Sequence, residues 1–119
     1  MNPDIELMAK IYQTYELDWM CDEIKDVNNL TKHHIVKKAD GGSNDISNYA
    51  LLTDNSHHLI HYLEDHYHKA YVELNGLFKE LYLSLQPPTE EYYERVRGIL
   101  KVVKKDIKNK KRRRNHKSR

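Results

Sequence analysis

The chain has 119 residues, of which 39% are hydrophobic and 32% charged, and its formal net charge is +2 at pH 7. This length is typical of one domain with a small core, to which the nine tyrosines can contribute their rings. The single cysteine, Cys21, excludes an intramolecular disulfide and a cysteine-based zinc site, and the lack of a signal-peptide pattern or long apolar run favours a soluble cytoplasmic protein.

The small net charge conceals a strong asymmetry along the chain. Residues 101–119 contain eleven lysines and arginines and one acid, a net charge of +10, whereas residues 1–100 have a net charge of −8. A cationic segment binds nucleic acid by releasing phosphate counterions, whatever the base sequence. We therefore predict one domain over residues 1–107 and a disordered basic tail over residues 108–119; a solvated end that only aids solubility is the alternative. The predicted DNA contacts are Lys110, Lys111, Arg112, Arg113 and Arg114.

The first quarter of the chain predicts one helix and little other regular structure. Asn2 can cap the helix and Pro3 suits its first position. Apolar residues then recur at helical spacing to about Leu17. Residues 19–21 form a short apolar run, and residues 26–29 have a turn-like composition.

Two short strands separated by a polar loop are predicted next. Residues 31–36 and residues 49–52 have the composition of strands, and residues 37–47 contain two adjacent glycines typical of a compact loop. Thr53 or Asp54 can cap the helix that follows.

The remaining elements are predicted to be helices, which gives an α+β, mostly helical fold. Apolar spacing over residues 59–74 indicates a long amphipathic helix, bent near residues 75–76 and continued through residues 78–85. Prolines at positions 87–88 end this segment, and Thr89 can cap the last helix. The apolar stripe of that helix is Tyr92, Val96, Ile99, Leu100, Val103 and Ile107.

Four histidines carry the main chemical signal. His57 and His61 are four residues apart, so on a helix their rings lie on one face and can present two nitrogens to one metal ion. His33 and His34 are adjacent in a predicted strand, so their rings are expected to diverge. One can then bind the metal while the other acts as a base, because neutral imidazole has an unperturbed pKa of about 6.5.

Acidic residues follow the helical histidines. Glu64, three residues after His61, or Asp65, four residues after it, can hold a ligand ring from behind, and Glu64 is the stronger candidate. An ordinary solvent-facing acid is the competing interpretation of each. The other histidines are interpreted as surface or core residues: His58, His66, His68 and His116.

Residues 33–61 present these groups in a specific order: two histidines, a Gly-Gly loop, an asparagine before a Leu-Leu strand, and a histidine on a helix. This ordered set resembles the core of the HNH endonucleases, a ββα-metal unit, and it covers about a quarter of the chain. Residues 59–64 are also similar to a branch of small HNH proteins of bacteria and phages. The resemblance implies a ββα core at about residues 30–74, between an N-terminal helix and C-terminal helices.

The resemblance also implies a role for each residue. His34 matches the general base that activates water, and Asn48 matches the asparagine that pins the loop and orients the base. Gly41 and Gly42 match the turn that folds the loop over the site. One divalent ion, Zn²⁺, Ni²⁺, Mn²⁺ or Mg²⁺, is expected on His33, His57 and His61.

Many HNH proteins carry two Cys-x-x-Cys pairs that bind a structural zinc ion. Here Thr53 and Ser56 stand at the positions of the second pair, and the first pair is missing. The site is therefore expected to be braced by packing, with the N-terminal helix and Trp19 as the candidates.

These features predict a metal-dependent endonuclease that hydrolyses DNA phosphodiester bonds, with DNA as its partner and no membrane association. A monomer and a homodimer are both compatible with the sequence. The alternative is a non-catalytic nucleic-acid-binding module of a phage or mobile-element complex, which would not require the full set of histidines. A histidine-rich metal-storage protein would not require the asparagine or the Gly-Gly loop.

Overall fold

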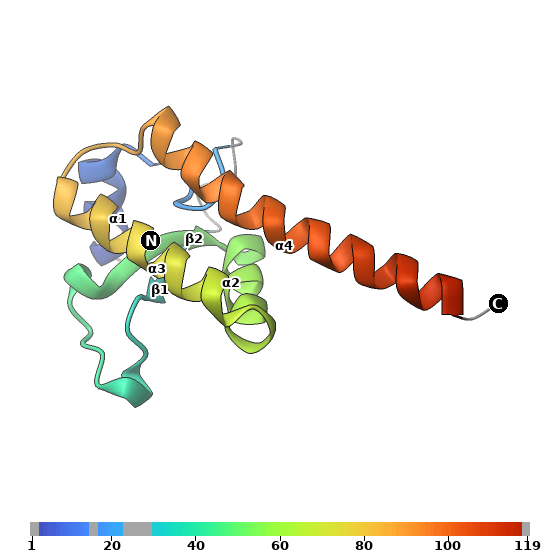
Figure 1. The fold of residues 1–119 in the computed structure, drawn as a ribbon. Helices are drawn as coiled ribbons and strands as arrows, with labels where there is room; N and C mark the ends of the chain where they lie inside the picture. Colours follow the sequence, from blue (N-terminus) through green and yellow to red (C-terminus); the bar gives the residue numbers. More distant parts are fainter. Residues whose placement is uncertain (1–2, 15–16, 23–29, 118–119) are drawn as a thin grey trace.

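The computed structural model describes residues 3–14, 17–22 and 30–117, with side chains to Arg112 in the last helix. Figure 1 shows a small two-stranded sheet surrounded by helices, and the predicted α+β, mostly helical class is confirmed. The elements are α1 (Pro3–Tyr12), β1 (Leu30–His34), 3₁₀ turns at Lys38–Asp40 and Ile46–Asn48, β2 (Tyr49–Thr53), α2 (Asp54–His66), α3 (His68–Ser84) and α4 (Glu90–Lys117).

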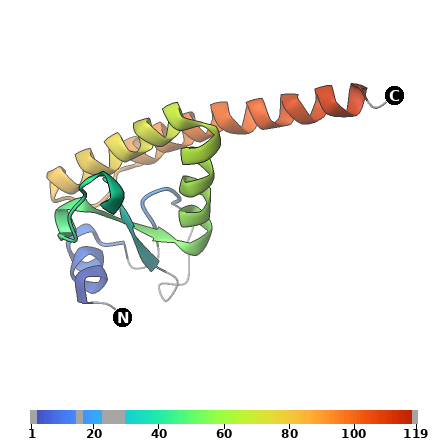
Figure 2. The ribbon, with the colours of Figure 1, turned by 90° about the horizontal axis from the view of Figure 1, so that it is seen from below.

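The two strands pair antiparallel, with Leu30 opposite Thr53 and His34 opposite Tyr49. Both lie within two residues of the predicted ranges. Figure 2 shows α1 on one side of this ribbon and α3 on the other. All five residues of β2 are buried, since both faces of the strand are covered.

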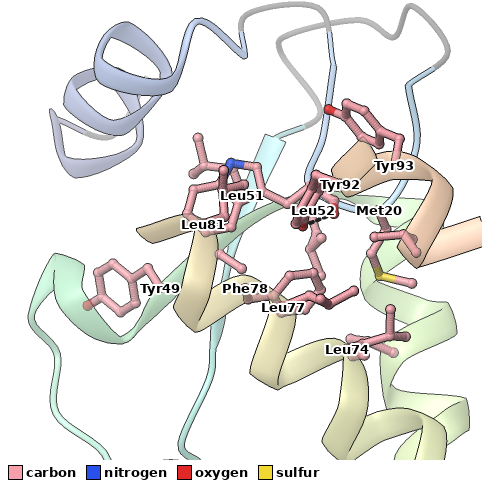
Figure 3. Close-up of a cluster of buried hydrophobic side chains, with 14 of the residues drawn as sticks. Met20, Tyr49, Leu51, Leu52, Leu74, Leu77, Phe78, Leu81, Tyr92 and Tyr93 are labelled. Atoms are coloured by element: carbon pink, nitrogen blue, oxygen red, sulfur yellow. Dashed lines mark hydrogen bonds between the residues drawn. The ribbon is translucent and has the colours of Figure 1, made fainter. Parts of the chain in front are cut away.

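Aromatic rings and leucines from distant segments form the core. Trp19 is fully buried, with its ring edge-on to Tyr12 at 5.0 Å between centroids and tilted against Phe78 at 6.4 Å. Figure 3 shows side chains of β2, α3 and the start of α4 converging in this core. As predicted, tyrosines contribute much of this small core. Among the described residues, five tyrosines are buried: Tyr12, Tyr49, Tyr71, Tyr92 and Tyr93.

A buried carboxylate fastens the Trp19 segment to the start of α2. Asp18 is fully buried, and its Oδ1 accepts hydrogen bonds from the backbone nitrogens of Met20 and Cys21 at 2.8 and 2.7 Å. Its Oδ2 accepts from Thr53, from the backbone nitrogen at 3.1 Å and from the hydroxyl at 2.7 Å. Thr53 is therefore anchored by a buried carboxylate from a distant part of the chain.

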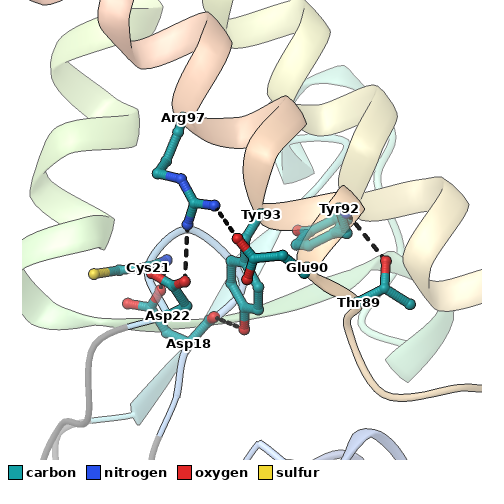
Figure 4. A network of polar contacts seen from close by, with 8 residues as sticks. All are labelled: Asp18, Cys21, Asp22, Thr89, Glu90, Tyr92, Tyr93 and Arg97. Atoms are coloured by element: carbon teal, nitrogen blue, oxygen red, sulfur yellow. Dashed lines mark hydrogen bonds and ion pairs between the residues drawn. The ribbon is translucent and has the colours of Figure 1, made fainter.

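The same segment is also tied to α4, as Figure 4 shows. The Tyr93 hydroxyl donates to the Asp18 carbonyl at 2.8 Å, and the Tyr92 hydroxyl donates to the Trp19 carbonyl. At the surface, Arg97 pairs with Asp22 at 2.8 Å. Trp19 thus lies in the core, and its segment is held by contacts of Asp18, Tyr92 and Tyr93.

The helix boundaries differ from prediction at two places. The first helix ends at Tyr12 rather than near Leu17, because Gln13 adopts a left-handed conformation (φ 53°). The long helix is broken at Tyr67, not near residues 75–76. Tyr67 has non-helical angles, and its hydroxyl donates to Asp106 of α4 at 2.7 Å. This break lets α2 follow the strands while α3 packs along α4.

The predicted disordered tail is wrong as far as residue 117, because α4 continues as a helix to Lys117. Residues 108–117 contain no glycine or proline, and lysine and arginine are favourable helix formers. Thr89 caps the helix as predicted, accepting from the Tyr92 nitrogen at 3.1 Å. The predicted Asn2 cap and the turn over residues 26–29 lie outside the described residues.

Candidate metal centre and active site

The structure brings the three predicted metal ligands together where β1 faces α2. The ring centroid of His33 lies 5.8 Å from that of His57 and 6.3 Å from that of His61. His57 and His61 stack with centroids 4.8 Å apart, as their spacing on one helix face predicts. Thr53, the last residue of β2, caps α2, because its hydroxyl accepts from the Ser56 nitrogen at 3.5 Å. His57 therefore lies in the first turn of α2.

His33 is the deepest of the three rings, at 3% exposure. Its Nε2 lies 2.9 Å from Asn75 Oδ1, and its ring meets Phe78 edge-on, so α3 holds it from behind. Burial, and to a smaller extent the neighbouring histidines, lower the pKa of His33 to about 4, against the opposing effect of the hydrogen bond to Asn75. The ring is therefore neutral at physiological pH and has a lone pair available for a metal.

His57 is held by the strand pair. Its Nδ1 lies 2.8 Å from the hydroxyl of Thr31, which itself contacts the Leu52 carbonyl at 2.8 Å. Burial, followed by the adjacent His61, lowers the pKa of His57. This ring too is biased toward the neutral form that binds metals.

His61 is the most exposed of the three, with 60% of its side chain accessible. Its Nδ1 lies 3.9 Å from Glu64 Oε1, and Glu64 Oε2 pairs with Lys37 Nζ at 2.7 Å. The hydrogen bond from Lys37 lowers the pKa of Glu64, which keeps the carboxylate charged. Glu64 thus lies beside the ring as predicted, whereas Asp65 is solvent-exposed.

His34 diverges from His33, as adjacent residues in a strand must. Its Nε2 lies 3.1 Å from Asn44 Oδ1, and its ring stands edge-on to Tyr49 at 5.1 Å. It nevertheless lies close enough to the His33 and His57 rings to add slightly to the lowering of their pKa values, which burial mainly causes. His34 is only partly buried, so water can reach it.

Asn48 closes the loop between the strands. Its Oδ1 accepts from the Val36 nitrogen at 2.8 Å, and its Nδ2 donates to the carbonyls of Val36 at 2.8 Å and Ser43 at 3.0 Å. Gly42 is required at this crossing, because a Cβ there would lie 1.8 Å from the Val36 oxygen. Gly41 adopts φ 87°, which glycine alone adopts without strain.

The predicted phosphate contacts lie on the part of α4 that projects from the body (Figure 1). Lys111 and Arg112 are exposed, whereas Lys110 pairs with Asp106 at 3.1 Å and lies over the Tyr67 ring at 5.2 Å. The side chains of Arg113 and Arg114 lie outside the described part of the structure.

Sequence reasoning missed several residues around the site. Thr31 contacts His57, and Asn75 and Phe78 contact His33, but none of the three carries a local pattern that identifies a ring partner. Lys32 is a further cation near His34, with its Nζ 4.9 Å from the centre of the Tyr49 ring. Its position immediately before the two histidines is the one signal that could have identified it.

The three histidines are the groups that could hold the implied metal ion. Within the described residues, no three His, Cys, Asp or Glu side chains form a ready-made metal cage. His33 and His57 each have one nitrogen engaged by an oxygen and a second nitrogen left over, and 60% of the His61 side chain is exposed. Two held imidazoles and an exposed third are a donor set that fits a nitrogen-preferring divalent ion, with positions left for water and phosphate oxygens.

Comparison with known proteins adds no relative. No family model matches the chain, and no curated protein or solved structure is significantly similar to it. No helix in the described part of the chain is long and apolar enough to cross a membrane.

Proposed function

We propose that the protein is a metal-dependent endonuclease that hydrolyses DNA phosphodiester bonds, with residues 30–66 serving as an HNH-type ββα unit. The observation that supports this most strongly is the meeting of the His33, His57 and His61 rings at one edge of the strand pair. Beside them, Asn48 closes the loop that carries Asn44, the hydrogen-bond partner of His34.

His33 and His57 would hold the ion, with His61 as the third ligand. The bound ion would supply positive charge to the scissile phosphate and to the departing 3′ oxygen. No residue of the chain needs to form a covalent intermediate, since positioning and charge stabilisation dominate phosphoryl-type transfer.

His34 would be the general base. Asn44 Oδ1 can only accept a hydrogen bond, so the 3.1 Å contact assigns the proton of His34 to Nε2 and leaves the lone pair on Nδ1. Nδ1 would take a proton from water as the water oxygen bonds to phosphorus. The bond from phosphorus to the 3′ oxygen then breaks, giving 5′-phosphate and 3′-hydroxyl ends.

The cations are suited to phosphate rather than to base edges. Lys32, beside the His34 and Tyr49 rings, and the exposed Lys111 and Arg112 of α4 would contact the DNA backbone. We therefore expect cleavage with little sequence preference and strong salt dependence.

The test is nicking or linearisation of supercoiled plasmid by the full chain, with Mg²⁺, Mn²⁺, Ni²⁺ and Zn²⁺ supplied separately. His34→Ala is expected to abolish cutting while metal binding persists. His58→Ala is the matched control, because His58 is an exposed histidine next to His57 on the same helix, and it should cut as the wild type does. DNA binding without cutting in any metal would favour the non-catalytic module, and cutting by His34→Ala at the wild-type rate would refute the role of the base.

A further inference from the structure

The hydrogen bonds around His57 determine which of its nitrogens carries a proton. The Thr31 hydroxyl has one proton, and it is donated to the Leu52 carbonyl at 2.8 Å, because a carbonyl can only accept. The 2.8 Å contact between Thr31 Oγ1 and His57 Nδ1 therefore needs a proton from the ring. His57 is thus protonated on Nδ1, and its lone pair is on Nε2.

The same argument gives the opposite result for His33. Asn75 Oδ1 can only accept, so the 2.9 Å contact requires a proton on His33 Nε2 and leaves the lone pair on Nδ1. Asn75 is itself 9% exposed, so little water competes for this contact.

We propose that Thr31 and Asn75 are positioning residues that hold His57 and His33 in opposite ring tautomers before a metal ion arrives, making His57 Nε2 and His33 Nδ1 the coordinating atoms. The metal in this statement rests on the proposed function, whereas the tautomers do not. A ligand ring whose second nitrogen donates to a fixed oxygen has its orientation and tautomer set in advance. The two holding residues come from different elements, Thr31 from β1 and Asn75 from α3.

The tautomers can be measured on the metal-free full chain by ¹⁵N-histidine NMR at pH 7.5. We expect His57 as the Nδ1-protonated form and His33 as the Nε2-protonated form. Thr31→Val, which removes the hydroxyl and keeps the shape, should convert His57 alone to a tautomer mixture. Asn75→Leu should do so for His33 alone, so each variant is the control for the other, and Thr31→Ser should restore the wild-type pattern.

Zn²⁺ affinity by calorimetry is the second readout. Each removal should weaken binding roughly 10- to 100-fold, while Asn55→Ala, an exposed asparagine on α2, should leave it unchanged. The proposal is overturned if the wild-type protein shows the opposite tautomers. It is also overturned if Thr31→Val and Asn75→Leu alter the tautomers but leave the Zn²⁺ affinity unchanged. The wild-type spectrum tests the tautomers without any variant, so the proposal can be refuted even if a variant fails to fold.

Failure of the nuclease hypothesis would be distinguishable from these outcomes. If the tautomers and the loss of Zn²⁺ affinity are as expected and plasmid stays uncut, the positioning roles stand and only the proposed hydrolysis falls.

Discussion

Asp18 and Thr53, 35 residues apart in the chain, are joined by two hydrogen bonds to a single carboxylate oxygen. This contact fastens the Trp19 segment to the residue at which β2 ends and α2 begins. It therefore acts on the start of the helix that carries His57 and His61.

Asp18→Ala should destabilise the fold strongly. Four donors lose their acceptor in a buried setting, so we expect a loss of roughly 3–5 kcal/mol in the free energy of unfolding, measured by urea denaturation. Asp22→Ala is the control, since it breaks a surface pair with Arg97 and should cost at most about 1 kcal/mol. Equal losses for the two variants would contradict the role of Asp18 as the anchor.

Gly42→Ala should disrupt the loop that Asn48 closes. The new Cβ would overlap the Val36 carbonyl oxygen at 1.8 Å, so the loop must open to admit it. We expect lower thermal stability and loss of any plasmid cleavage. Gly76→Ala is the opposite case, because a Cβ there meets no described atom within 4 Å and the residue lies inside α3. That variant should gain roughly 0.5–1 kcal/mol, and a comparable loss at both glycines would contradict the clash.

Acid should destabilise the metal-free protein through His33. The pKa of His33 is about 4 in the fold and 6.5 as the ordinary value, so between these values the unfolded chain binds a proton that the folded chain does not. Stability is therefore full above about pH 6.5 and falls as the pH is lowered toward 4, by about 3 kcal/mol in total. The lowered pKa of His57 acts in the same direction.

Urea unfolding as a function of pH checks this expectation. His33→Leu should flatten the decline between pH 6.5 and 4, whereas His58→Ala, which alters an exposed ring, should retain it. An unchanged slope in His33→Leu would show that other groups cause the acid sensitivity.

Lys111 and Lys110 are adjacent on α4 and should contribute differently to DNA binding. Lys111 is exposed, whereas Lys110 is engaged by Asp106 and Tyr67. Lys111→Ala should weaken binding to duplex DNA and reduce the slope of log affinity against log salt by about 1. Lys110→Ala should change that slope less. Fluorescence anisotropy over a salt series measures both, and a larger change at Lys110 would overturn this assignment.

Local chemistry was enough to predict much of the fold. Hydrophobic periodicity predicted both strands to within two residues and the order of the helices, although not all of their ends. Thr89 and Thr53 cap their helices as predicted, because capping involves only the next three residues. The shared face of His57 and His61 and the divergence of His33 from His34 follow from helix and strand geometry alone.

Long-range contacts decided the remaining features. The break at Tyr67 accompanies its hydrogen bond to Asp106, 39 residues away, and α3 continues without a break through residues 75–76. Asn75 reaches His33 across 42 residues, and Asp18 reaches Thr53 across 35. A local pattern can say that a buried amide or carboxylate needs a partner, but the identity of that partner depends on which elements pack together. The chain alone thus determines the rings of the candidate metal site, and packing determines which residues hold those rings and in which tautomer.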